Sequence, residues 1–129
     1  MRTDRLHPAR ELEPEQLEGC AFAFAVDVTQ FAMGIRDALP APVLDGLVAA
    51  AVKTGAEVAN AYENPSRHHA LAHLNSARRA VYETLYWLRL ATAAGAVDTE
   101  AGEALLKRAG ELHGWLTTTC TRRHKQVES

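Results

Sequence analysis

The sequence predicts an all-α protein, folded as an antiparallel up-down-up-down four-helix bundle, and its length of 129 residues predicts one domain. Alanine occurs 24 times and leucine 15 times, whereas valine and isoleucine together occur only 10 times. Alanine and leucine favour helices, whereas β-branched and aromatic residues favour sheets. Apolar residues also recur at intervals of three or four along segments that prolines and glycines separate, and this spacing is typical of one face of a helix.

The first helix is expected over residues 14–39, after an N-terminal arm at residues 1–13. Pro14 is tolerated in the first turn of a helix, and the acidic residues that follow it are favoured near the positive end of the helix dipole. The strand-like alternation over residues 21–28 is outweighed by the longer helical period. The apolar residues of that period are Leu17, Ala21, Phe24, Val28, Phe31, Ile35 and Leu39.

The second helix is expected over residues 43–63 and the third over residues 66–94. Two prolines in residues 40–42 end the first helix and begin the second, and Ser66 is a good N-cap for the third. Gly95 then supplies a C-terminal cap. The inner face of the second helix carries Leu44, Leu47, Ala51, Gly55, Val58 and Tyr62, and that of the third carries Leu71, Leu74, Ala77, Val81, Leu85, Leu88 and Ala91.

The fourth helix is expected over residues 98–123, and residues 126–129 are expected to form a tail. The predicted connections between the helices are short, and helices joined in this way pack as antiparallel neighbours. We therefore expect the four-helix bundle to span residues 14–125. The apolar positions of the fourth helix are Leu105, Ala109, Leu112, Leu116 and Cys120.

The third helix carries more apolar residues than a helix that buries a single face. Residues 85–88 and 90–91 place large apolar groups nearly all the way around it. Surplus apolar surface on a small protein often marks an association site. A monomer with a wide core is one interpretation, and self-association is the other. The expected oligomer interface consists of Tyr82, Tyr86, Trp87 and Leu90.

Three segments resemble a known family of helical proteins. Residues 47–62 are similar to the second helix of the four-helix-bundle family of 23S-rRNA intervening-sequence proteins, which includes the accessory variability determinant of diversity-generating retroelements. Residues 77–97 are similar to the third helix, with small residues followed by Glu83, a Leu-x-Leu-Ala pattern and a glycine near the end. Gly-Trp-Leu at residues 114–116, followed by two arginines, is similar to the last helix of the retroelement relative.

The resemblance, which covers about residues 20–123, implies a homopentameric ring of antiparallel four-helix bundles without catalytic residues. For the retroelement relatives it also implies binding to a reverse transcriptase and to nucleic acid. The chain departs from the family at Asn60 and Ala61, where the family has glutamate and glycine, and it has a mixed rather than a basic segment at residues 63–67. We therefore expect a non-enzymatic oligomeric scaffold that binds RNA or DNA, or a reverse transcriptase.

Charge is distributed unevenly along the chain. Residues 1–65 carry 5 basic and 10 acidic side chains, for a net charge of −5, whereas residues 66–129 carry 9 basic and 6 acidic ones, for a net charge of +3. In the expected bundle, the starts of the first and third helices lie at the same end as the finish of the fourth, so that basic residues gather there. Helix-dipole complementarity with surface ion pairs is one explanation, and contact with phosphates is the other. The candidate nucleic-acid-binding residues at this end are Arg67, Arg122, Arg123 and Lys125. Arg78 and Arg79 of the third helix are further candidates, for which an ion pair with Glu83 or Glu57 is the alternative.

Motifs of enzymes and membrane proteins are missing from the sequence. It has no nucleophilic triad, phosphate-cradling glycine loop or dinucleotide fingerprint, no apolar run of about 20 residues that would span a bilayer, and no apolar signal peptide. We expect no enzymatic activity, no cofactor and a cytoplasmic location. His69 and His73 lie one helical turn apart, where a solvated or capping role is expected. A metal-binding bundle that uses both histidines is an alternative, as is a purely protein-binding oligomer.

Overall fold

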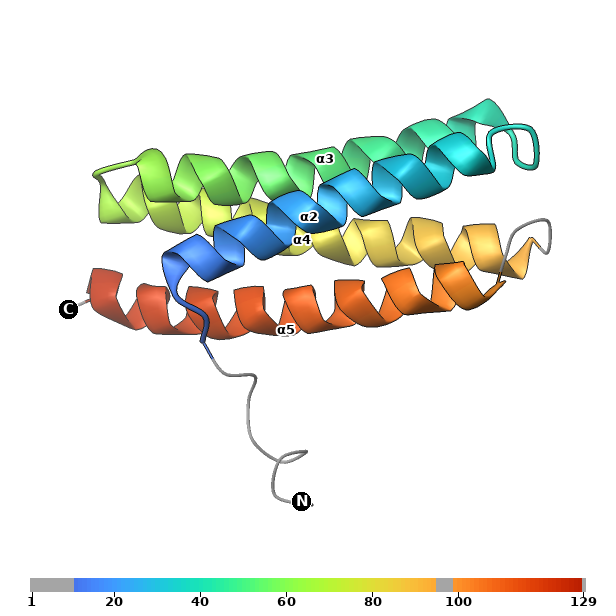
Figure 1. Ribbon diagram of the computed structural model, residues 1–129. Coiled ribbons are helices and arrows are strands. Elements are labelled where there is room, and N and C mark those ends of the chain that lie inside the picture. The colour runs from blue at the N-terminus through green and yellow to red at the C-terminus, as the bar shows by residue number, and fades with distance from the viewer. Residues whose placement is uncertain (1–10, 95–98, 129) are drawn as a thin grey trace, which may run out of the picture.

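Four α-helices make up the part of the chain that the computed structural model describes, which is residues 11–94 and 99–128 (Figure 1). They are α2 (Pro14–Gly34), α3 (Ala41–Glu63), α4 (Arg67–Ala93) and α5 (Thr99–Glu128). Each helix packs against the next one in the chain, and α2 also contacts α5, which closes the bundle. Successive helices run in opposite directions (Figure 1). The described residues contain no strand, so the predicted all-α four-helix bundle is confirmed.

The first helix is shorter than predicted, because α2 ends at Gly34 rather than at residue 39. Glycine is a weak helix former. Beyond it, the backbone N–H of Ile35 donates to the carbonyl of Ala32 (3.2 Å), and residues 35–38 form turns. These turns reverse the chain before α3 begins. Ile35 and Leu39, which were expected on the last turns of the helix, still pack against the core from the connection.

The starts of α3 and α4 lie within two residues of the predicted positions. α3 begins at Ala41 rather than at residue 43, because Pro42 fits into the first turn of a helix. α4 begins directly after Ser66, whose Oγ accepts a hydrogen bond from the backbone N–H of His69 (3.3 Å). Ser66 therefore caps this helix as predicted.

The last helix is longer than predicted, because α5 continues to Glu128 instead of ending at residue 123. An ion-pair contact between His124 and Glu128 (Nε2 to Oε2, 3.1 Å) joins its last turns, as pairs four residues apart on a helix commonly do. The expected tail at residues 126–129 is thus helical as far as residue 128. The expected arm before residue 11, the cap expected at Gly95 and the helix start expected at residue 98 lie outside the described residues.

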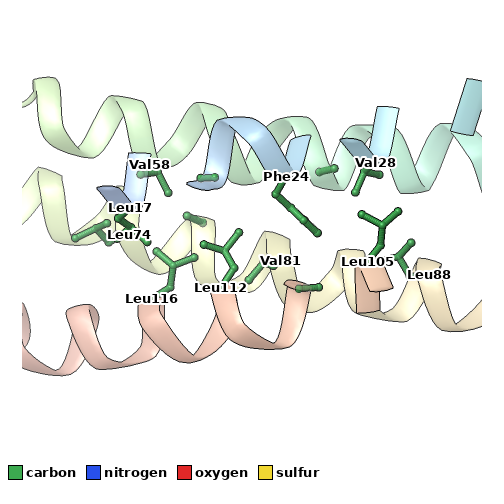
Figure 2. Packing of buried hydrophobic residues seen from close by; sticks show 14 of the residues in the cluster. Leu17, Phe24, Val28, Val58, Leu74, Val81, Leu88, Leu105, Leu112 and Leu116 are labelled. Atoms are coloured by element: carbon green, nitrogen blue, oxygen red, sulfur yellow. The ribbon is translucent and has the colours of Figure 1, made fainter. Parts of the chain in front are cut away.

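Side chains from all four helices meet in one core along the bundle axis (Figure 2). The face that each helix buries is the one the apolar spacing predicts, although Ala32 and Ala61 are buried as well. Phe31, Gly55, Tyr62 and Leu85, which were expected on these faces, are only partly buried. Figure 2 shows three successive layers of these side chains, formed by Leu17, Leu74 and Leu116, by Phe24, Val81 and Leu112, and by Val28, Leu88 and Leu105.

Among the described residues, three threonines are the buried polar side chains of this core, and each is hydrogen-bonded within its own helix. The hydroxyls of Thr54, Thr84 and Thr119 each donate to the carbonyl four residues earlier, at 2.8, 2.8 and 2.9 Å. Within the described residues, no buried side-chain nitrogen or oxygen lacks a hydrogen-bond partner. The buried polar side chains of the described residues are thus hydrogen-bonded, and the candidate residues named from the sequence lie mostly at the surface.

Candidate functional site

The predicted basic residues divide into two clusters. Arg67, Arg122 and Arg123 lie together at one end of the bundle, where they line a polar cleft of about 360 Å³. Arg122 is ion-paired with Glu11 (Nη1 to Oε1, 2.7 Å). The guanidinium of Arg123 lies over the ring of Tyr62, 5.6 Å from its centroid. Two of the three cations of this end cluster (Arg67, Arg122 and Arg123) therefore already have a partner within the chain.

Arg78 and Lys125 line a different cleft, of about 490 Å³, between α4 and α5. Arg78 donates a hydrogen bond from Nη2 to Oδ1 of Asn75 (3.3 Å) in this α4–α5 cleft. Arg79, the next residue on α4, is exposed and lines neither cleft. The six candidate residues thus do not form one site, because neighbouring positions on α4 and on α5 point in different directions around each helix.

Three of the four residues expected at an oligomer interface form an exposed row on α4. Tyr82, Tyr86 and Leu90 are 65%, 57% and 36% exposed and follow one another at intervals of four residues. We call this row the α4 ridge. The ring of Tyr82 also lies against His113 of α5, with 5.5 Å between the ring centroids, so the ridge is on the side of α4 that faces α5.

Trp87, the fourth of these residues, is placed differently. It is half-buried and packs against the core. Its indole ring lies against Gly46 of α3, and its Nε1 donates a hydrogen bond to Oε2 of Glu83 (3.1 Å). Its position therefore serves the contact between α3 and α4 within one chain.

A second apolar surface lies between α2 and α3, and it was not expected from the sequence. Phe22, Val26 and Val52 are 68%, 37% and 49% exposed and border a groove of about 470 Å³. A Cβ added to Gly55 would lie 3.3 Å from the carbonyl oxygen of Ala21, which shows how closely the two helices approach beneath the groove. We call it the α2–α3 groove, and its floor carries the small residues Ala25, Gly55, Ala56 and Ala59.

One signal in the sequence could have revealed this groove. Phe22, Val26 and Met33 lie outside the inward-facing apolar row of α2, so apolar side chains surround this helix as they surround α4. The argument that selected the third helix as an association surface applies equally to the first. Although it carries exposed apolar residues, the described part of the chain has no helix with the length and hydropathy to cross a membrane.

The two candidate metal-ligating histidines have different surroundings. Nδ1 of His73 lies 2.6 Å from Oε1 of Glu57, across the contact between α3 and α4, and Ser76 donates a hydrogen bond to Oε2 of the same carboxylate (3.1 Å). His69 is exposed at the start of α4. Among the described residues, no group of three or more His, Cys, Asp or Glu side chains is arranged to hold a metal ion.

The polar cluster around Glu57 alters its ionisation. Partial burial alone would raise the pKa of Glu57, but the hydrogen bonds from His73, Ser76 and Asn60 and the charge of His73 outweigh it and lower the pKa below the usual value of 4.5. Since the folded-state pKa lies below that of the unfolded chain, folding favours the ionised carboxylate. This stabilisation is fully present above the unfolded pKa and is lost as the pH falls through the lower folded-state pKa.

We expect the variant Glu57→Gln to lower the free energy of unfolding by about 1 kcal/mol at pH 7, because the amide cannot replace a charged hydrogen-bond acceptor. The difference from the natural protein should shrink as the pH falls below 4.5 and through the lower folded-state pKa of Glu57, because the carboxyl then becomes as uncharged as the amide. The free energies of unfolding of both proteins are measured by urea unfolding, monitored by circular dichroism, at several pH values. Glu103→Gln, at an exposed position of α5, is the matched control and should have little effect at any pH. A loss of stability that is the same at every pH would contradict this prediction, because it would show that the shape of the Glu57 side chain matters and its charge does not.

The chain is similar in structure to a protein of unknown function from the S23 ribosomal protein family of Bacteroides thetaiotaomicron VPI-5482, known from a crystal structure. The TM-score is 0.79 and the sequence identity 19%, and the similarity covers 85% of this chain and 99% of the other. At this identity the likeness establishes a shared helical fold. That fold is consistent with the resemblance to the 23S-rRNA intervening-sequence proteins. No protein-family model and no curated protein matches the sequence significantly.

Proposed function

We propose that this protein is a non-enzymatic scaffold that self-associates through the α4 ridge and the α2–α3 groove and binds a partner as an assembly. The observation that carries the proposal is the presence of two exposed apolar surfaces of different shape on one small chain. A protein of 14.1 kDa rarely exposes so many large apolar side chains unless they are covered in use.

The two surfaces are complementary in shape. The α4 ridge presents Tyr82 and Tyr86 one helical turn apart, whereas the α2–α3 groove has a floor of alanine and glycine residues. Helices pack by inserting a row of large side chains into a groove between smaller ones. The ridge of one copy therefore fits the groove of a second copy, where it covers the apolar side chains on both.

A contact between two different surfaces leaves one ridge and one groove free on each pair of copies. Such contacts continue until they close into a ring or extend into a filament. We propose a closed ring, and the resemblance to the 23S-rRNA intervening-sequence proteins supports a pentamer. The limited size of the α4 ridge also favours closure, since several weak contacts in a ring support one another.

Light scattering on the purified protein tests this assembly. The natural chain should have a mass several times 14.1 kDa, and the variants Ala56→Glu, in the groove, and Tyr86→Glu, on the ridge, should each have the monomer mass. Ala104→Glu introduces the same charge at an exposed position of α5 outside both surfaces and should leave the mass unchanged.

A mixture of the two interface variants provides a sharper test of the ridge-in-groove contact. Ala56→Glu keeps an intact ridge and Tyr86→Glu keeps an intact groove, so an equimolar mixture should form 1:1 pairs and no larger species. A monomeric natural protein at micromolar concentration would contradict the assembly. Assembly of either variant by itself, or two monomeric variants that fail to pair when mixed, would contradict the ridge-in-groove geometry.

For the partner we propose RNA or a reverse transcriptase, in the cytoplasm, as in an accessory subunit of a ribonucleoprotein. The net charge of +3 on residues 66–129 and the ribosomal-protein name of the structurally similar family support this class. Nucleic-acid binding weakens steeply with added salt, which separates this proposal from a purely protein-binding oligomer. No observation favours the metal-binding alternative, because Nδ1 of His73 is already engaged by Glu57.

A further inference from the structure

Arg78 differs from the other arginines that are held against the bundle. Arg108 is ion-paired with Asp27, and Arg122 with Glu11. Arg78 is half-buried as well, yet among the described residues no carboxylate pairs with it. Its partners there are the side-chain oxygen of Asn75, to which it donates a hydrogen bond (3.3 Å), and the thiol of Cys120. A guanidinium has five N–H donors, so most of those on Arg78 have no acceptor among the described residues.

The free donors of Arg78 lie in the α4–α5 cleft together with other groups that favour an anion. Thr117, Thr121, His124 and Lys125 line the same cleft from α5, at positions that share one face of that helix. The acidic residue of the cleft is Glu128, which lies at the last turn of α5 and contacts His124 (3.1 Å). The part of the cleft nearest Arg78 therefore combines a positive charge with hydroxyl donors and has no carboxylate.

We infer that the α4–α5 cleft binds a phosphate group, with Arg78 as its principal ligand. A planar guanidinium binds phosphate oxygens through two parallel hydrogen bonds, and charge-assisted bonds of this kind are about twice as strong as neutral ones. A phosphate has more acceptor oxygens than a carboxylate, so it can also accept from the threonine hydroxyls and from Lys125. The cleft volume of about 490 Å³ accommodates such a group with room for a substituent.

The charge of Arg78 also acts on neighbouring side chains. Burial lowers the pKa of His113, and the positive charge of Arg78 lowers it further. Burial raises the pKa of the Cys120 thiol, while the nearby Arg78 partly offsets that effect. A guanidinium whose charge was neutralised by a carboxylate would have less influence on either group. Bound phosphate should therefore raise the pKa of His113, which provides a readout that is independent of affinity.

This inference deepens the proposed function by naming a site for the phosphate chemistry of an RNA partner, but it does not depend on self-association. It also differs from the sequence-based expectation, which placed phosphate contacts mainly at the end of the bundle. The end cluster is partly neutralised by Glu11, whereas the α4–α5 cleft is not neutralised around Arg78. A protein that assembles but does not bind phosphate would leave the proposed function standing and would overturn this inference alone.

To test the inference, the full-length protein is titrated with inorganic phosphate at constant ionic strength, and binding is monitored by two-dimensional NMR of the backbone amides. Signals from residues around Arg78 and Thr121 should shift, and Arg78→Gln should weaken the binding about tenfold. Arg89→Gln removes an exposed arginine from the same helix outside the cleft and should not change it. Equal binding by the natural protein and Arg78→Gln would overturn the inference.

Two further measurements test phosphate binding without the Arg78→Gln variant and identify the class of ligand. Should Arg78→Gln fail to fold, the pKa of His113 in the natural protein is measured with and without phosphate; a value that does not rise in phosphate relative to chloride would overturn the inference. A short single-stranded oligonucleotide and a glutamate-rich peptide are then compared at equal charge. If the oligonucleotide binds more tightly than inorganic phosphate, the natural ligand is a phosphodiester. If inorganic phosphate binds more tightly, the natural ligand is a small phosphate compound. If the peptide binds more tightly than either, the cleft does not select phosphate and the inference is overturned.

Discussion

Phe24→Ala is expected to lower the free energy of unfolding by about 3–5 kcal/mol, which is the usual cost of removing a buried aromatic ring. Phe24 is 1% exposed and occupies the middle layer of the core (Figure 2). It is also covered by the guanidinium of Arg108, which is ion-paired with Asp27 and so joins α5 to α2. The contact between α2 and α5 is the smallest between neighbouring helices, so little else compensates for the cavity. Chemical unfolding followed by circular dichroism measures the change.

Phe22→Ala provides a control only two residues away. Phe22 is 68% exposed, so the same truncation there should change the stability of the single chain by less than about 0.5 kcal/mol. Both variants are compared at one low protein concentration, because self-association adds stability that depends on concentration. Equal losses from the two substitutions would contradict the assignment of Phe24 to the core and of Phe22 to the surface.

Gly46→Ala is expected to lower the free energy of unfolding by about 1–3 kcal/mol, although alanine is the better helix former by about 1 kcal/mol. A Cβ at this position would lie 2.5 Å from Cε2 of Trp87, well inside van der Waals contact. The indole cannot turn away freely, because it packs on the core and donates its N–H to Glu83. Thermal unfolding measures the loss, and the indole N–H signal of Trp87 should move in the NMR spectrum.

Gly110→Ala is the matched substitution on an open helix surface. A Cβ added there meets nothing within 4 Å, so the helix propensity of alanine should raise the stability by up to about 1 kcal/mol. The two glycine substitutions should thus have opposite signs. A stabilising Gly46→Ala would mean that α3 and α4 can separate around Trp87 without cost.

Most of the buried residues of the core could be predicted from the sequence, because burial on a helix follows the local spacing of apolar residues. Leu17 and Leu74 lie more than 50 positions apart, but each is identified as buried by its own neighbours at intervals of three and four. Ser66 was recognised as a cap for the same reason, since its preference for a helix start is a property of a few adjacent residues. The end of α2 was not predicted correctly, because the turn after Gly34 depends on where α3 must lie.

The surface sites could be predicted only in part, because they depend on contacts between helices. The exposed row on α4 was expected, but the α2–α3 groove was not, because a groove depends on the close approach of two helices at Gly55 as well as on its apolar residues. The arginines and the lysine that line the two polar clefts were among the predicted candidates, but their division between two clefts was not predicted. Nothing local in the sequence distinguishes Arg122, which pairs with Glu11 from the other end of the chain, from Arg78, which pairs with no carboxylate among the described residues.

The sequence by itself therefore determined the helices, their order and the side chains that fill the core, because each of these depends on residues within a few turns of one another. Only the tertiary structure decided which charges are neutralised and which apolar side chains remain uncovered. Those properties depend on pairs such as Arg122 and Glu11, or Phe22 and Val52, that are distant along the chain and become neighbours only when the four helices pack.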